Sequence, residues 1–271
     1  MSTSIHLCQP ATHLSCAACC GIYNHTLNTR DELDNMFARR ERLFEKVRRG
    51  SSTIEAYQEA IRRTEISGRI YQTIYTCEFA GYVSKDQRRV GCMIHPAANN
   101  GNDLRSISFY GREICDGHFC PSYSKLEDNE AMTIIACLDD WYLYGAVITD
   151  IDFVKTFFRI AQDRLGESVD ASRVSGIPDA ARAVRDYCGL KVAWPFRDTS
   201  RPRFGKYYFT GEEYDIARID YKALGAEPSP FDAILLSLAS SFNNKDELEQ
   251  AHLIIEGIIE DFRRAYERLD G

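Results

Sequence analysis

The distribution of cysteines constrains this chain more than any other feature. The chain has 271 residues and ten cysteines, and eight of the ten lie before residue 121. Cysteines that serve as small core residues would be scattered more evenly. The N-terminal segment has neither a basic start nor a continuous apolar stretch, so we expect no secretory signal and a cytoplasmic protein. In a reducing compartment, clustered cysteines are typical of metal ligands rather than of disulfides.

The first cluster is the segment HLSCAACC, in which two residues separate Cys16 from Cys19. This spacing lets two thiolates from one tight turn reach the same ion. Cys20 follows directly, and adjacent side chains diverge. Cys20 could therefore serve a second metal, bridge two metals or remain a reactive thiol. His13 lies three residues before Cys16 and extends the pattern to His-x2-Cys-x2-Cys-Cys.

Further candidate ligands lie between residues 77 and 120. They are Cys77, the Cys-x2-His pair of Cys92 and His95, and the group of Cys115, His118 and Cys120. A tetrahedral zinc site takes four thiolate or imidazole ligands, and a cubane iron–sulfur cluster generally takes four thiolates. The chain offers enough groups for one cluster with some to spare, or for two mononuclear sites. The roles of Cys8, His95 and His118 stay open at this point.

The segment HLSCAACC, followed by cysteines in GCMIHP and CDGHFC, resembles the YkgJ-like family of zinc- or iron-chelating bacterial proteins over about residues 13–121. The family pattern is Cys-x2-Cys-x2-Cys-Cys, then a cysteine, then Cys-x-Ile-Tyr and a closing pair of cysteines. In this chain the pattern falls on Cys16, Cys19, Cys20, Cys77, Cys92, Cys115 and Cys120. His13 stands at the family's first cysteine, and His95 stands at its tyrosine. The resemblance implies that these cysteines hold a zinc or iron ion, or an iron–sulfur cluster, with His13 completing or extending the site.

Hydrophobic periodicity predicts a mainly α fold, with α+β as the alternative. Residues 30–49 predict a helix that Thr29 caps and Gly50 stops, and a second helical pattern starts at residues 51–53. We expect these two helices to form a hairpin. Residues 77–123 lack such periodicity and are expected to be irregular, with a bound metal supplying order. The N-terminal half is therefore expected to be an irregular cysteine-rich metal-binding module attached to helices.

The remainder of the chain predicts a helical bundle with at most a short β-hairpin. One buried helix is expected through residues 132–146, followed by a helix that Asp150 or Asp152 caps. Pro178 fits the first turn of a short helix, and Gly189 fits its end. Residues 206–221 predict two short strands around a TGEE turn, and residues 229–242 and 245–269 predict two closing helices.

Charge divides the chain into two parts. Residues 1–126 carry a net charge of +3 and residues 127–271 carry −10, from 16 Lys and Arg with 13 Asp and Glu, and from 17 with 27. We predict a cysteine-rich metal-binding module over 1–126 and an acidic, mainly helical region over 127–271, or one integrated domain. The acidic balance and the absence of a basic stripe argue against a duplex nucleic-acid binder. No apolar run reaches about 18 residues, so no membrane span is expected.

The leading hypothesis for function is a metal-binding protein that coordinates zinc, iron or an iron–sulfur cluster. A metal- or Fe–S-dependent enzyme is the first alternative, because a few bacterial proteins with a similar cysteine pattern are associated with protein lysine methylation. The second alternative is a partner-binding module with structural zinc, acting on a protein partner or as a homodimer. Sequence motifs for nucleotide, dinucleotide, zincin and serine-hydrolase sites are absent. Cys137 and Cys188 are predicted to be core residues.

Overall fold

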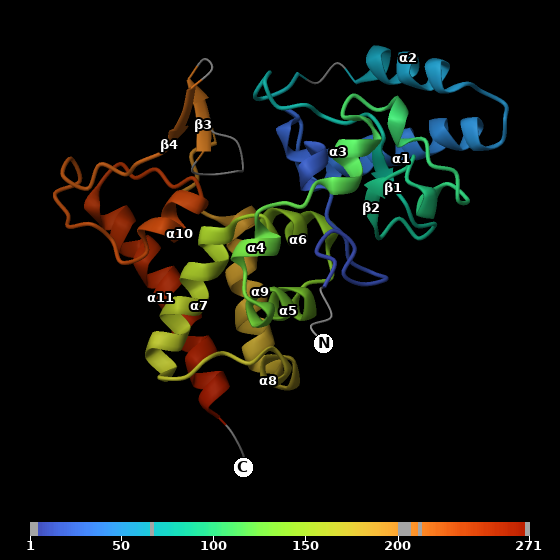
Figure 1. The fold of residues 1–271 in the computed structure, drawn as a ribbon. Coiled ribbons are helices and arrows are strands. Elements are labelled where there is room, and N and C mark those ends of the chain that lie inside the picture. The colour runs from blue at the N-terminus through green and yellow to red at the C-terminus, as the bar shows by residue number, and fades with distance from the viewer. Residues whose placement is uncertain (1–4, 66–67, 200–206, 211–212, 269–271) are drawn as a thin grey trace. The chain divides into compact units, whose positions relative to one another are not determined.

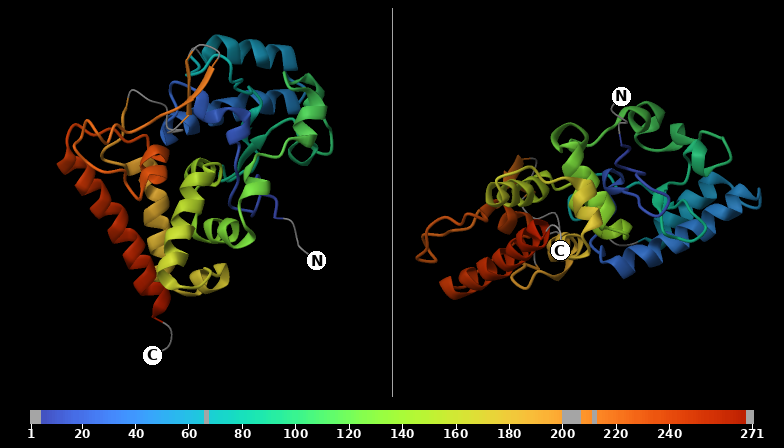
Figure 2. Two further views of the ribbon diagram at one scale, coloured as in Figure 1. Left: turned by 60° about the vertical axis from the view of Figure 1, so that its left-hand side comes forward. Right: turned by 90° about the horizontal axis from the view of Figure 1, so that it is seen from below.

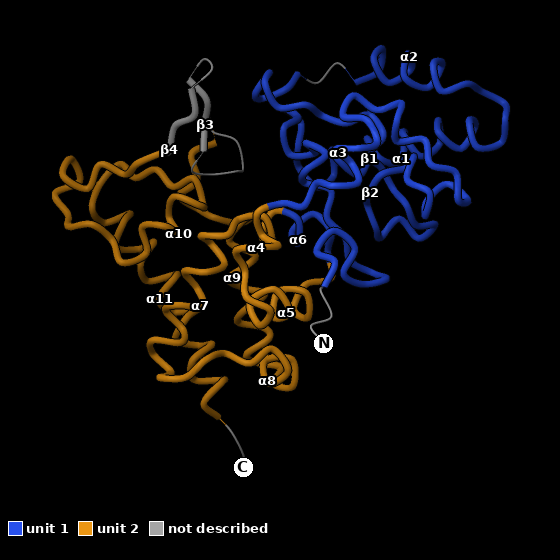
Figure 3. Tube along the Cα trace, viewed as in Figure 1, with its two compact units in different colours: residues 1–120, 140–145 blue, residues 121–139, 146–271 orange. Residues whose placement is uncertain are grey.

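The computed structural model describes residues 5–65, 68–199, 207–210 and 213–268 (Figure 1). The chain divides into two compact units (Figure 3). Unit 1 comprises residues 1–120 with 140–145, and unit 2 comprises residues 121–139 with 146–271. Helices make up most of the regular structure of the described residues, so the mainly α fold class is confirmed.

The two N-terminal helices of unit 1 begin where their capping residues predict. Helix α1 (Arg30–Arg48) follows Thr29, which forms a capping box with Glu32. The N–H of Thr29 donates to Glu32 Oε2 at 2.8 Å. Helix α2 (Ile54–Thr64) follows Thr53, whose hydroxyl accepts the N–H of Ala56 at 3.2 Å. The two helices pack together, which confirms the expected helical hairpin.

The rest of unit 1 contains more regular structure than its sequence pattern predicts. The elements are η1 (Ala18–Cys20), η2 (Ile22–Asn24), β1 (Ala80–Tyr82), β2 (Val90–Cys92), η3 (Pro96–Ala98), η4 (Arg105–Ile107) and α3 (Gly111–Gly117). Strands β1 and β2 pair antiparallel, and β1 packs against α1. Tyr57 of α2 stacks on Phe79 with their ring centroids 5.6 Å apart, and both side chains are buried. This aromatic core fixes the β1–β2 hairpin against helices α1 and α2.

Unit 2 is a helical bundle. Its helices are α4 (Ser122–Lys125), α5 (Asp128–Cys137), α7 (Ile151–Leu165), α8 (Ala171–Gly176), α9 (Pro178–Ala193), α10 (Asp232–Ser237) and α11 (Lys245–Glu267), and α6 (Trp141–Ile148) runs from unit 1 into unit 2. Helices α7, α9 and α11 lie side by side (Figure 2). Phe153 and Tyr187 stack between α7 and α9, with centroids 4.3 Å apart. Strands β3 (Tyr207–Thr210) and β4 (Glu213–Ile216) pair antiparallel, as the hairpin prediction requires, although residues 211–212 of its turn lie outside the described residues.

Two expectations about the helices of this region are wrong. The single helix expected through 132–146 is divided into α5 and α6, because Leu138 adopts an extended conformation and Asp140 starts a new helix. The Asp140 side chain accepts the N–H of Leu143 at 2.8 Å, which satisfies a free donor of the first turn.

Helix α9 continues past Gly189, where we expected its end. Lys191, two residues later, is buried and pairs with Asp150, with Nζ and Oδ2 2.5 Å apart. Its Nζ also donates to Ser237 O at 2.8 Å. These tertiary contacts outweigh the weak helix propensity of one glycine. Among the described residues, no helix combines the length and apolar character needed to cross a bilayer.

Candidate metal centre

The N-terminal cysteine segment is tied by its backbone to two other cysteines of unit 1. The N–H of Cys16 donates to Cys8 O at 2.8 Å. The N–H of Cys77 donates to Cys20 O at 2.9 Å. The two ends of the Cys-x2-Cys-Cys turn therefore lie beside different partners, Cys8 at one end and Cys77 at the other.

Gly21 allows the turn to lie this close to the segment before Cys77. Its φ is +76°, a left-handed conformation that side chains rarely tolerate. A Cβ at this position would lie 2.1 Å from Tyr75 O, which is far inside van der Waals contact. The glycine after the paired cysteines is thus required by the approach of the two chain segments.

The β1–β2 hairpin brings Cys77 and Cys92 to the same end of its ladder. Ala80 lies opposite Cys92, and the N–H of Met93 donates to Phe79 O at 2.9 Å, which extends the pairing beyond the strands. Cys77 is three residues before β1, and Cys92 is the last residue of β2. Two cysteines that are fifteen positions apart in the chain thereby become neighbours.

The third source of cysteines is helix α3 and the residues that follow it. Cys115 lies in α3 and is exposed, and its Sγ is 3.7 Å from the hydroxyl of Ser108. Cys120 lies beyond the end of α3 and is buried. The four residues between the two cysteines include the helix end at His118, so the thiols can face different neighbours.

We define two thiol sets by the neighbouring thiols that act electrostatically on Cys16 and Cys19, and on Cys20, Cys77 and Cys92. The first thiol set is Cys8, Cys16, Cys19 and Cys120. The second thiol set is Cys20, Cys77, Cys92 and Cys115. In the first set, the Cys19 and Cys120 thiols are in hydrogen-bonding contact. Cys16 also acts electrostatically on Cys20, so the two sets are themselves neighbours.

Backbone N–H groups point at the sulfur atoms of three of these cysteines. The N–H of Ala18 donates to Cys16 Sγ at 3.4 Å. Cys77 and Cys92 accept in the same way from the residues two positions ahead, Phe79 and Ile94. Each of these bonds lowers the pKa of its thiol, because a donor stabilises the thiolate form that binds metals.

Burial and neighbouring thiols act in the opposite direction. Burial raises the pKa of Cys16 to about 12, and Cys8 and Cys120 add to the effect. The pKa of Cys19 is raised by its hydrogen bond with Cys120 and then by burial. Burial and the thiols of its own set raise the pKa of Cys20 well above its ordinary value. A cation would reverse this balance, since it would neutralise several thiolates that otherwise repel one another.

The structure gives the predicted site residues unequal support. It brings together Cys16, Cys19, Cys20, Cys77, Cys92, Cys115 and Cys120 within unit 1. It adds Cys8, whose role the sequence left open and whose position depends on a backbone contact eight residues away. His13 is half-buried, and the charges that act most strongly on Cys16, Cys19 and Cys20 are other thiols.

The other two histidines near the thiols have separate roles in the local structure. The Nδ1 of His95 accepts the N–H of Ala97 at 3.1 Å and caps η3. Burial, and then the positive charge of Arg105, lowers the pKa of His95. His118 ends α3 and is exposed. Both histidines are close in sequence to cysteines of the two thiol sets, but neither belongs to a set.

The thiols are neighbours, but their sulfur atoms do not converge on a common position that could hold an ion. Among the described residues, no three histidine, cysteine, aspartate or glutamate side chains are arranged to hold a metal ion. The ten cysteines, all of which lie within the described residues, form no disulfide bond. Metal binding therefore needs a local rearrangement of sulfur positions, and it stays a proposal.

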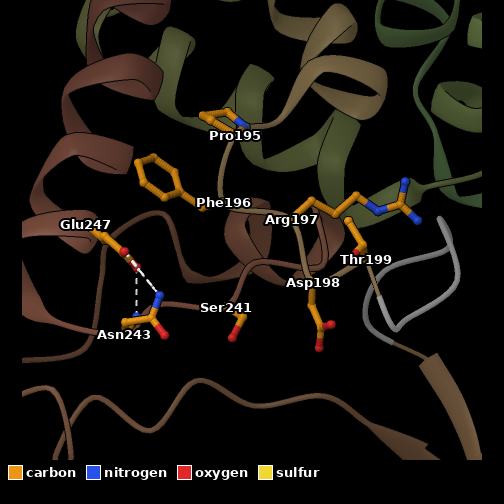
Figure 4. A pocket seen from close by; sticks show the side chains of 8 residues that line it. All are labelled: Pro195, Phe196, Arg197, Asp198, Thr199, Ser241, Asn243 and Glu247. Carbon is orange, nitrogen blue, oxygen red and sulfur yellow. Dashed lines mark hydrogen bonds between the residues drawn. The ribbon is translucent and has the colours of Figure 1, made fainter.

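Unit 2 has a polar pocket with a volume of about 300 Å³ where residues 195–199 pass the start of α11 (Figure 4). The lining residues are Pro195, Phe196, Arg197, Asp198, Thr199, Ser241, Asn243 and Glu247. Asn243 Nδ2 donates to Glu247 Oε1 at 3.1 Å. The Glu247 carboxylate therefore binds the residue that precedes the N-cap of α11. No predicted ligand lines the pocket.

Unit 1 also buries a histidine beside the ion pair of Arg40 and Glu65. His25 is 4% exposed, and its Nδ1 lacks a hydrogen-bond partner within the described part of the chain. Burial, followed by the charge of Arg40, lowers the pKa of His25 to about 4. The unfolded chain, with an ordinary histidine pKa of about 6.5, binds a proton before the folded chain does.

Acid should therefore destabilise unit 1 through His25. The stabilising effect is present above pH 6.5 and is lost as the pH falls toward 4, by about 3 kcal/mol. Denaturant unfolding across this pH range should show a shallower loss in His25→Gln than in the wild type. The exposed His118→Gln variant is the matched control and should keep the wild-type slope. Equal slopes in all three proteins would show that His25 is not a source of acid sensitivity.

Comparison with protein-family models, with curated proteins and with solved structures yields no match for this chain.

Proposed function

We propose that unit 1 is a metal-binding module that holds zinc, iron or an iron–sulfur cluster through clustered cysteine thiolates. One observation carries the proposal: cysteines from the N-terminal segment, the β1–β2 hairpin and the region of α3 meet in one unit, with their thiols acting on one another. As thiolates these groups would repel one another, and a bound cation would compensate that repulsion.

The local backbone supports the same proposal. Donors directed at Cys16, Cys77 and Cys92 favour thiolates, which are the form of cysteine that binds metals. The expected alternatives, a metal-dependent enzyme and a partner-binding module with structural zinc, stay predictions from the sequence. A cytoplasmic location, which is part of the proposal, would keep these thiols reduced.

Substitution of single cysteines tests this function. Cys16→Ser and Cys19→Ser should lose most of the bound metal and reduce solubility, because each removes a ligand from the site. Cys137→Ser should keep the metal, since Cys137 is a buried residue of α5 in unit 2. The readout is elemental analysis, with an absorption spectrum, of protein purified without oxygen.

The matched control separates a ligand from a merely buried thiol. Burial raises the pKa of Cys137 to about 11, as it raises the pKa of Cys16, Cys77 and Cys92, but Cys137 belongs to neither thiol set. Full metal content and normal stability in Cys16→Ser would contradict the proposed function.

A further inference from the structure

We infer that residues 111–119, which comprise α3 and the two residues after it, form a hinged arm that ion pairs hold against the rest of unit 1. The arm opens locally, and salt favours its opening. This inference goes beyond the proposed function, because it rests on contacts of the described residues and not on a bound metal.

The arm has no buried apolar face. Every residue from 111 to 119 is half-buried or exposed, although Ser108 before the arm and Cys120 after it are buried. The large apolar side chains of the arm, Ile114 and Phe119, are 54% and 56% exposed. Packing of an apolar face supplies most of the stability of a short helix in a protein. Helix α3 therefore needs another source of attachment.

Ion pairs supply that attachment and join the arm to the region of η4. Arg105 Nη1 lies 2.5 Å from Asp116 Oδ1, and Arg112 Nε lies 3.2 Å from Asp103 Oδ2. Arg105 and Asp103 also pair with each other, with Nη2 and Oδ2 2.7 Å apart. Arg105 is buried and Asp103 is half-buried, whereas Arg112 and Asp116 on the arm are exposed. Water and salt therefore reach the arm's member of each pair.

Gly111 provides a hinge where the arm begins. Its φ is +70°, and a Cβ at this position would lie in open space, so no neighbouring segment clamps the backbone there. The two residues before it are anchored on one ring. Phe109 stacks on Tyr75 with centroids 4.6 Å apart, and Tyr110 packs edge-on against Tyr75 at 5.1 Å. The arm can therefore move while these residues and the buried Cys120 stay in place.

This attachment is much weaker than the core of unit 1. Exposed ion pairs contribute little to stability, because water screens the charges and ordering the side chains costs entropy. By contrast, Leu33, Phe37 and Phe44 of α1 are completely buried. Segments with few buried apolar contacts open at a lower free energy than the core of the same domain. The arm should therefore open while α1 stays folded.

Amide hydrogen exchange of the full-length protein measures this opening. In the wild type, the amides of α3 should exchange faster than those of α1. Raising the salt concentration from about 0.1 M to about 1 M shortens the Debye length from about 10 Å to about 3 Å. Exchange in α3 should then become about fivefold faster, because the ion pairs on the arm are screened. Exchange in α1 should change little.

Asp116→Asn tests the ion pairs themselves. The substitution removes the acceptor on the arm, while Arg105 keeps Asp103 as its partner and no buried charge is left alone. Exchange in α3 should be faster than in the wild type at low salt and should respond less to added salt. Glu113→Gln is the matched control, because it removes the same charge from the same helix and Glu113 makes no ion pair within the described part of the chain. This control should behave as the wild type does.

A metal ion on Cys115, as the proposed function has it, would add a further tie to the arm. Cys115→Ser removes that tie, and the salt response of α3 should be equal or larger in this variant. The inference is overturned if α3 is as protected as α1 in both the wild type and Cys115→Ser, or if its exchange responds neither to salt nor to Asp116→Asn. Should Cys115→Ser lose protection throughout unit 1, the variants that keep Cys115 decide, and equal exchange in Asp116→Asn and Glu113→Gln would contradict the inference.

Discussion

Stripping the metal from the reduced protein should unfold unit 1. Binding of structural zinc is coupled to folding and contributes on the order of 10 kcal/mol, which is comparable to the whole stability of a domain. Without the ion, the cross-links that it would make between the N-terminal segment, the β1–β2 hairpin and the region of α3 are lost. Amide hydrogen exchange before and after treatment with a strong zinc chelator should show protection lost in α1, β1 and β2.

Helices α7, α9 and α11 hold no proposed ligand and provide the internal reference for this experiment. A second control is chelator saturated with zinc beforehand, which should leave exchange unchanged. Unit 1 would be shown to fold without metal if its protection survived while elemental analysis confirmed that the metal was gone.

Glu65→Leu should destabilise unit 1 by about 3–5 kcal/mol, because it leaves Arg40 as an uncompensated buried charge. Arg40 is 1% exposed, and its Nη2 lies 2.5 Å from Glu65 Oε2. The same guanidinium donates to Cys77 O at 3.0 Å and to Ala80 O at 2.7 Å. The ion pair therefore holds the backbone of the hairpin that carries Cys77.

Chemical denaturation of the variants measures this effect. Glu59→Leu is the matched control, since Glu59 also pairs with arginines, Arg62 and Arg63, but on an exposed surface. That control should lose at most about 1 kcal/mol. The double variant Arg40→Met with Glu65→Leu should recover much of the loss, because it removes both charges. A similar loss in Glu65→Leu and Glu59→Leu would show that Arg40 does not depend on its partner.

Local sequence signals predicted the helix starts well. Thr29, Thr53 and Asp150 cap α1, α2 and α7, because the capping contact lies within three residues of the cap. Local sequence signals failed where contacts between distant residues determine where a helix ends. The ion pair of Lys191 with Asp150 stabilises the part of α9 that continues past Gly189. A short window of sequence around Gly189 shows neither the distant partner nor the burial of Lys191.

The hairpin in the cysteine-rich region shows the same limit. Strands β1 and β2 have three residues each, which is too short for a recognisable alternation of polar and apolar residues. Their pairing is stabilised by packing of β1 on α1 rather than by local propensity. A region that the sequence presents as irregular therefore has a defined core around Phe79.

For the candidate site, spacing singled out the cysteines, whose role as ligands stays a prediction, but it did not indicate which of them lie close together. The divergence of Cys19 and Cys20 was predictable from their adjacency, and the structure places them in different thiol sets. Cys8 had no spacing signal, because its neighbour Cys16 is reached through a backbone hydrogen bond. The family pattern placed His13 at its first cysteine. In the structure, the side chains that act electrostatically on Cys16 are the thiols of Cys8 and Cys120.

X-ray absorption at the edge of the metal that copurifies with the wild-type protein tests the central claim most directly. Thiolate coordination predicts a dominant shell of sulfur scatterers, at about 2.3 Å if the metal is zinc. A protein that carries no metal, or a metal surrounded only by nitrogen and oxygen, would contradict the claim that the clustered cysteines form its binding site.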